Sequence, residues 1–313
     1  MSENTGAAPD APAPTAPAVA APAPVPAPPA SASPPQAGSA PAQAGLARFL
    51  RGIRIREDLA WKTGTLLGGA CLGALLAFWF LITIGEGPFI SPAILPGPFE
   101  VVAAFPRLHF DHALVRSCLI SLARVTAGFL IAAVAALPLG IAMGASTRCK
   151  AFFAPVSTIG GYVPIAALVP LTISWFGIDE TQKIAFLAIA SFVMLLPMVV
   201  RAIDKVDDVY LHTGYTLGAD GWQAVRHVLV PVALADIYGS LRLLYGVGWG
   251  YIILAEVVGA DKGLGYLIQL SQRRNMMAEM YAVLGVIVAL SLGIDWALRK
   301  LGQRLFPYAK QEA

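Results

Sequence analysis

Residues 64–85 read GTLLGGACLGALLAFWFLITIG and contain no charged side chain. In an α-helix, which rises about 1.5 Å per residue, a stretch of this length covers the roughly 30 Å hydrocarbon core of a bilayer. The whole chain has a similar character, because 57% of its 313 residues are hydrophobic and only 13% are charged. That is about half the charged fraction of an average soluble domain. The composition therefore indicates an integral membrane protein.

Five further apolar stretches follow this first span. They predict membrane helices over 117–143, 152–176, 184–200, 237–258 and 281–298. The stretch 152–176 contains Pro155, Pro164 and Pro170, so we expect a kinked helix whose freed carbonyl groups are satisfied by neighbours. The predicted fold class is an all-α integral membrane protein of about six transmembrane helices. Its membrane domain covers 64–306, and a short C-terminal tail covers 307–313.

The first 63 residues differ in composition from this membrane domain. Residues 1–44 contain 16 Ala and 12 Pro, no Lys or Arg, and no helical or strand periodicity. We expect a disordered cytoplasmic tail there, because such a segment cannot bury a core and lacks the basic start of a secretory signal. Within 45–63, apolar residues at 46, 49, 50 and 53 alternate with arginines. This pattern predicts an amphipathic helix in the headgroup region of the lipid bilayer.

The distribution of Lys and Arg predicts the orientation. With the N-terminus inside, five of these residues precede the first span, two lie between 146 and 151, three between 201 and 236, and four after Leu298. The inner side then holds 14 and the outer loops hold six, so the positive-inside rule predicts that both termini are cytoplasmic. These basic residues flank apolar spans instead of forming one stripe, so we expect no nucleic-acid partner.

Sequence motifs for catalysis are missing. The stretch GADKGLG at 259–265 lacks the order of a phosphate-binding loop, so we expect no ATP hydrolysis by this chain and no bound cofactor. His109, Asp111 and His112 are too few to predict a metal site. The three cysteines lack paired spacing and are expected to be free packing residues: Cys71, Cys118 and Cys149.

The predicted cytoplasmic loop at 201–236 is too long and too patterned for a simple connection. Gly218 and Gly221 permit a tight turn, and Trp222 begins a second amphipathic stretch that we expect to end at Pro231. The loop is therefore predicted to contain one or two short helices.

This loop also carries a spacing typical of one protein family. Gly218 is followed, after nine residues, by Val228-Leu229-Val230-Pro231, which resembles the Gly-x9-Ile-x-Leu-Pro half of the cytoplasmic signature of binding-protein-dependent ABC permeases. The resemblance covers 114–306 and extends to the nitrate, sulfonate and taurine branch through SLARVTAGF at 121–129, LPLG at 137–140, WFGI at 175–178, AE at 255–256 and GLGYLI at 263–268. The family usually begins its signature with Glu-Ala-Ala, where this chain has His212-Thr213-Gly214.

The resemblance implies a type I ABC importer permease in a bacterial inner membrane, forming the path for a small solute, here an anion of the nitrate, sulfonate or taurine type. The implied partners are a cytoplasmic ATP-binding subunit dimer, which uses the ATP, an external solute-binding protein and a second permease copy. In the family the signature loop is a coupling helix that docks on the ATPase. Carried over, this role falls on His212, Thr213, Gly214, Leu217, Gly218, Ala219 and Pro231.

Three charged residues lie within the predicted spans and are candidates for the solute path: Arg124, Arg242 and Glu256. For an anionic solute, Arg124 is the best single candidate. Two structural roles remain open, because Arg124 and Glu256 could form an ion pair and Arg242 could reach the headgroups.

The sequence leaves three other functions open. The alternatives are an ion-coupled secondary transporter, an ABC importer of an uncharged or aromatic small molecule, and a membrane scaffold without a transport role. A secondary transporter usually shows internal repeats and a midplane ionisable relay, and neither is clear in this sequence.

Overall fold

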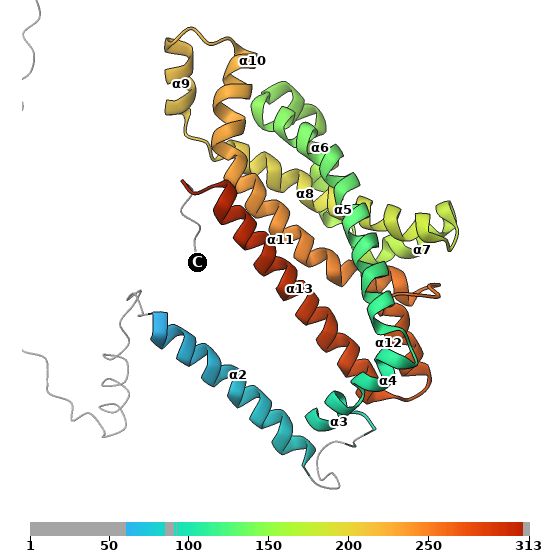
Figure 1. The fold of residues 1–313 in the computed structure, drawn as a ribbon. Helices are drawn as coiled ribbons and strands as arrows, with labels where there is room; N and C mark the ends of the chain where they lie inside the picture. Colours follow the sequence, from blue (N-terminus) through green and yellow to red (C-terminus); the bar gives the residue numbers. More distant parts are fainter. Residues whose placement is uncertain (1–60, 85–90, 92, 309–313) are drawn as a thin grey trace, which may run out of the picture. The chain divides into compact units, whose positions relative to one another are not determined.

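The computed structural model describes residues 61–84, 91 and 93–308. Every regular element in these residues is helical. The predicted tail at 1–44 and most of the predicted interfacial helix at 45–63 lie outside the described residues. Contacts between residues divide the chain into two units, 1–64 and 65–313. The helical bundle is formed within the second unit (Figure 1).

Five helices in the described residues are long and apolar enough to cross a membrane, and a sixth candidate is a bent pair. The five are α2 (Trp61–Thr83), α5 (Leu114–Ala145), α8 (Glu180–Asp204), α11 (Val230–Val257) and α13 (Met277–Leu305). The bent pair is α6 (Thr147–Tyr162) and α7 (Leu168–Phe176), joined through a 3-10 turn at Ile165–Ala167. The short helices are α3 (Pro98–Ala103), α4 (Phe105–Phe110), α9 (Asp208–Thr216), α10 (Gly221–Ala224) and α12 (Leu264–Arg273).

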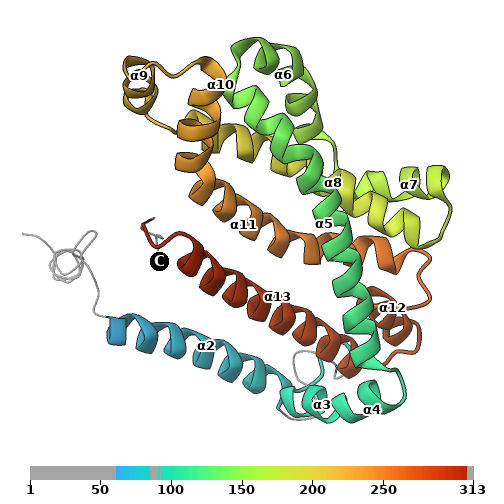
Figure 2. The same ribbon diagram turned by 45° about the horizontal axis from the view of Figure 1, so that its top comes forward.

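Close packing of α5 on α8 organises the bundle. A Cβ added to Gly128 would lie 2.5 Å from the Cβ of Leu187, and one added to Gly144 would lie 2.6 Å from the Cβ of Ile203. Both distances are too short for real side chains, so glycine is required where these two helix backbones approach each other. The later glycine of α5, Gly144, contacts the later residue of α8, Ile203, which means that the two helices run parallel (Figure 2).

The parallel pair decides how the chain passes between α5 and α8. Two parallel spans require the chain to return across the bilayer between them, and α6 and α7 are the helices available for that return. A Cβ at Gly160, near the end of α6, would lie 3.2 Å from Cγ1 of Val193, in the middle of α8. The predicted third span therefore runs from the Ala145 end of α5 back to the Glu180 end of α8.

This crossing is broken rather than gently kinked. Its two helices meet at 88°. Pro164 stands at the break and cannot donate a backbone hydrogen bond, and the residue before it, Val163, has extended backbone (φ −70°, ψ 122°).

One expectation about the fifth span is wrong. The stretch from Trp222 does not end at Pro231, because helix continues from α10 through a five-residue π-helix, Val225–Leu229, into α11. Pro231 lies in the first turn of α11, where a missing N–H is tolerated, and the wider π turn accommodates the change in hydrogen-bond register. The fifth span therefore begins before the predicted start at Ile237.

Helix α11 runs antiparallel to its neighbours α5 and α13. Its Tyr245 hydroxyl lies 2.7 Å from the Thr126 hydroxyl of α5, and its Tyr238 hydroxyl donates to the Leu298 carbonyl of α13 at 2.7 Å. Two buried apolar clusters fill the bundle, one around Phe186 and the other around Leu196. The α9–α10 end and the α4–α12 end lie at opposite ends of these long helices (Figure 1).

Candidate functional site

The α9–α10 segment (208–224) forms a helix, a tight turn and a second helix start. Asp207 caps α9 by accepting a hydrogen bond from the Val209 N–H at 3.0 Å, and Asp220 caps α10 by accepting from the Gln223 N–H at 2.7 Å. Between the two helices Gly218 has φ +86°, a conformation that other residues rarely adopt. The tight turn at Gly218 and one short helix, α9, are therefore confirmed, whereas α10 is the start of the long helix that continues into α11.

Large apolar side chains of this segment are exposed. Leu217 is 84% exposed and Trp222 70% exposed, and both lie next to the Gly218 turn. Tyr215 adds an exposed aromatic ring at 52%. An exposed apolar patch at one end of a helical bundle is typical of a protein interaction surface.

The residues predicted for this role fall into two groups. Those from His212 to Ala219 lie together on α9 and its turn, where His212 and Thr213 are exposed. Gly214 is buried because α9 packs there on the π-helix, with Val228 Cγ2 3.4 Å from the position of a Cβ. Pro231 is exposed but lies on α11, past that π-helix.

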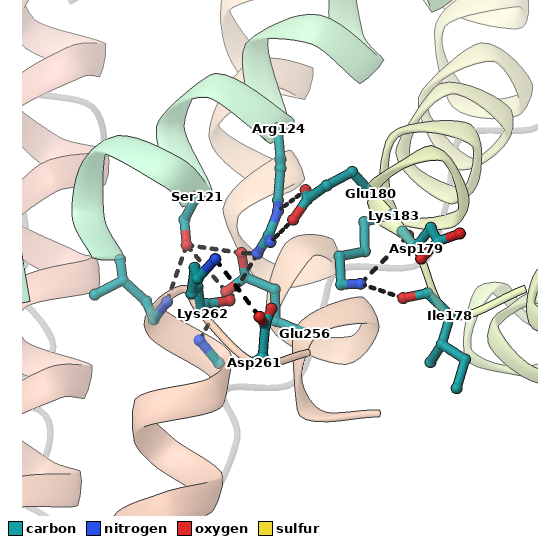
Figure 3. A network of polar contacts seen from close by, with 11 residues as sticks. Ser121, Arg124, Ile178, Asp179, Glu180, Lys183, Glu256, Asp261 and Lys262 are labelled. Carbon is teal, nitrogen blue, oxygen red and sulfur yellow. Dashed lines mark hydrogen bonds and ion pairs between the residues drawn. The ribbon is translucent and has the colours of Figure 1, made fainter. Parts of the chain in front are cut away.

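At the other end of the bundle lies a buried charge network centred on Glu256 (Figure 3). This carboxylate is 0% exposed and accepts hydrogen bonds from the Ser121 hydroxyl at 2.8 and 2.9 Å, Arg124 Nη1 at 2.7 Å and the Gly265 N–H at 2.8 Å. The Gly265 N–H belongs to the first turn of α12, so the carboxylate also satisfies an otherwise unpaired donor at a helix N-terminus.

Two glycines make room for the carboxylate. A Cβ on Gly263 would lie 2.5 Å from the Glu256 carboxyl atoms, and one on Gly265 would lie 2.6 Å from the Glu256 Cβ. Gly263 also has φ +113°, which only glycine adopts without strain. The stretch GADKGLG, which has the wrong order for a phosphate loop, is therefore the backbone that encloses Glu256.

Arg124 connects Glu256 to a second carboxylate. It is 2% exposed, and its Nη1 also donates to the Lys262 carbonyl at 2.8 Å. Its Nε donates to Glu180 Oε2 at 2.6 Å, and its Nη2 donates to the other oxygen of the same carboxylate. This two-point geometry is the strong form of an Arg–carboxylate pair.

Lys183 lies beside this network and is also buried. It is 2% exposed, and its Nζ donates to the Ile178 carbonyl at 2.7 Å and to the Asp179 carbonyl at 3.3 Å. The neighbouring Asp261 is fully exposed, and a hydrogen bond with its own backbone, together with the charge of Lys262, lowers the pKa of its carboxyl group.

The three charged residues predicted for the solute path therefore have different positions. Arg124 and Glu256 form the ion pair considered as one alternative. Arg242 lies on the same helix as Glu256, farther toward its N-terminal end, and pairs instead with Asp295 of α13 at 3.2 Å. Asp295 also binds Arg299 at 3.1 Å. Contact of these residues with a solute stays a prediction.

Sequence reasoning missed three members of the network. Ser121 and Gly265 stand in the stretches SLARVTAGF and GLGYLI, which were matched to the family without a role for either residue. Glu180 lies between the predicted spans 152–176 and 184–200 and was given no role. A signal was nevertheless present in the sequence. An Arg and a Glu buried in a membrane need more hydrogen-bond partners than the two side chains can supply to each other, so further polar partners were to be expected.

The described residues contain no group of three or more His, Cys, Asp and Glu side chains placed to hold a metal ion. His112 instead lies 3.7 Å from Glu279 of α13.

Comparison with known proteins identifies the family. Residues 136–307 match the family described as "Binding-protein-dependent transport system inner membrane component", so the chain belongs to it. The taurine transport system permease protein TauC of Escherichia coli is 31% identical over 76% of this chain and 87% of its own length. The putative aliphatic sulfonates transport permease protein SsuC of Bacillus subtilis is 29% identical over 81% of this chain and 90% of its own length.

Solved structures confirm the fold. An inward-facing structure of the MetNI methionine ABC transporter matches with TM-score 0.56 and 22% identity over 61% of this chain and 95% of that chain. An amino acid ABC transporter solved with histidines matches with TM-score 0.54 and 17% identity over 66% of this chain and 98% of that chain.

The chain is thus a multi-pass inner-membrane permease subunit of an ATP-driven ABC importer, in the nitrate, sulfonate and taurine branch. Permease subunits of this family are not enzymes themselves, and they work with an ATP-binding subunit and a substrate-binding protein. The alternatives of a secondary transporter and a membrane scaffold are set aside by this membership.

Proposed function

We propose that this permease imports a small organic solute that carries a sulfonate group, with taurine as the first candidate. The relatives named for taurine and aliphatic sulfonates support this solute class, since they match the chain over three quarters of its length or more. Two copies of the chain form the path between them, with lipid around them.

The observation that carries the coupled mechanism is the exposed apolar tip of the α9–α10 segment. Leu217 and Trp222 flank the left-handed Gly218 turn and are exposed at 84% and 70%. In this proposal they insert into a groove of an ATP-binding subunit, which hydrolyses the ATP. Closure of two such subunits then moves α11 through the continuous helix that begins at Gly221.

The proposed orientation follows from the same assignment. The α9–α10 segment faces the cytoplasm, as do both chain termini, and the Glu256 network lies toward the external side. The excess of Lys and Arg in the segments assigned to the inner side supports this orientation.

Transport by the reconstituted complex tests the proposal. The permease, its cognate ATP-binding subunit and its binding protein are placed in proteoliposomes, and uptake of labelled taurine is measured with and without ATP. We expect ATP-dependent uptake that unlabelled alkanesulfonates compete away and that an uncharged aromatic compound does not. Competition by the aromatic compound alone would replace the sulfonate assignment with the alternative of an uncharged solute.

A further inference from the structure

Arg124 presents two different edges to the network. Its Nη1 is committed to the interior, because it donates to Glu256, at 0% exposure, and to the Lys262 carbonyl. The other edge, formed by Nε and Nη2, is directed at Glu180 (Figure 3). A guanidinium edge of this kind matches any planar pair of anionic oxygens.

Glu180 is the exposed member of an otherwise buried set. Its side chain is 57% exposed, whereas that of Arg124 is 2% exposed. Among the described residues, Arg124 is the sole hydrogen-bond partner of the Glu180 carboxylate. Glu256, by contrast, is held by three separate groups. The Glu180 carboxylate is therefore already hydrated and can give up its place at Arg124 to another anion, whereas the Glu256 carboxylate cannot.

The buried charges require an anion at the place where Glu180 stands. Arg124 and Lys183 are buried cations, and Glu256 is the buried anion, so the set without Glu180 carries a net charge of +1. Lys183 also attracts the Glu180 carboxylate electrostatically. Buried charge without a counter-ion is strongly unfavourable, so an anion that displaces Glu180 must replace its charge.

We propose that the Nε and Nη2 edge of Arg124, with the charge of Lys183 nearby, is an anion subsite of the permease and that Glu180 is its tethered, displaceable occupant. The ligand is the sulfonate or carboxylate group of a small organic anion. In the resting protein Glu180 fills the subsite, and an arriving solute exchanges with it. This inference rests on the proposed function for the identity of the solute, but the chemistry of the subsite requires only an anionic group.

The exchange has a consequence for solute selection. A solute without an anionic group cannot replace the Glu180 charge, so the subsite stays closed to it. Selection would then operate in the permease as well as in the external binding protein.

Binding to the purified permease–ATPase complex, without binding protein, tests the subsite. The probes are taurine and methanesulfonate, with ethanolamine as the comparator that lacks the anionic group, and calorimetry reports affinity. Glu180→Gln removes the competing charge and keeps the side-chain shape. We expect it to bind both sulfonates on the order of tenfold more tightly than wild type and to leave ethanolamine unchanged.

Two further variants separate an anion subsite from an ordinary ion pair. Asp261→Asn removes one exposed negative charge from the adjoining loop, which acts on Glu180 and Lys183 through space and does not contact Arg124, so we expect a smaller gain in affinity than for Glu180→Gln. Adding Arg124→Lys to Glu180→Gln keeps the positive charge and removes the two-point edge, so the gain should disappear. Thermal melting of each complex identifies variants that fail to fold.

The outcomes distinguish this inference from the proposed function. If wild type transports taurine but Glu180→Gln binds both sulfonates no better than wild type or Asp261→Asn, the subsite is overturned and the transport function stands. If wild type does not transport taurine but Glu180→Gln gains affinity for methanesulfonate, the solute assignment fails and the subsite stands. Equal gains for ethanolamine would also contradict an anion subsite.

Discussion

The Glu256 carboxylate and the Gly265 N–H, 2.8 Å apart, join the end of α11 to the beginning of α12. The chain between them has to fold back tightly around a buried charge. Gly263 permits this, because its φ is +113° and a Cβ there would lie 2.5 Å from the carboxyl group. A family stretch that carries no catalytic motif thus has a clear structural function.

Removal of the Glu256 charge should destabilise the protein strongly. Glu256→Gln leaves Arg124, at 2% exposure, without its fully buried counter-ion. Loss of one partner from a buried ion pair costs about 3–5 kcal/mol. We expect a clearly lower melting temperature for the detergent-purified permease. Asp261→Asn, which removes a fully exposed carboxylate, is the control and should melt like wild type. Equal melting of Glu256→Gln and wild type would contradict the network.

Gly218→Val should abolish transport and leave membrane insertion intact. The φ of +86° at Gly218 is strained for a β-branched residue, so the turn that presents Leu217 must change shape. No atom lies within 4 Å of a Cβ at this position, so the effect comes from the backbone and not from a clash.

Gly221→Ala is the matched control, since Gly221 also has open space around it and begins an α-helix. Membrane content by immunoblot and ATP-dependent uptake are measured for both variants. Wild-type uptake by Gly218→Val would show that the left-handed turn is unnecessary for coupling.

Gly128→Ala should loosen the packing of α5 on α8. The added Cβ would lie 2.5 Å from the Leu187 Cβ and 3.1 Å from the Ile184 carbonyl oxygen, so the helices must separate. Overpacking of this kind costs about 1–3 kcal/mol. Gly239→Ala in α11 is the control, because nothing lies within 4 Å of its Cβ position and alanine favours helix. Thermal unfolding in detergent should rank Gly128→Ala below wild type and Gly239→Ala at or above it.

Thiol labelling can test the orientation and the broken crossing together. The native cysteines Cys71, Cys118 and Cys149 are free and are first replaced by Ser. Single cysteines then replace Thr147, the first residue of α6, and Ile178, which follows α7. A membrane-impermeant reagent added to spheroplasts should label position 178 and reach position 147 only after lysis. Labelling of both positions from one side would mean that α6 and α7 form a re-entrant loop.

The sequence alone predicted those features that depend on local composition and spacing. Uncharged stretches such as 64–85 predicted the spans, because the bilayer fixes the length of an apolar helix. The spacing from Gly218 to Pro231 indicated the family, because a turn that requires glycine restricts the residue type at one position of the chain. Both kinds of information are local.

The tertiary structure decided the features that depend on which helices meet. The parallel packing of α5 on α8 places Gly128 against Leu187, and no local sequence pattern predicts that contact. Arg124, Glu180 and Glu256 stand far apart in the chain, yet one buried guanidinium needs both carboxylates. Burial of a charge makes its partners obligatory, but the fold chooses which residues those partners are.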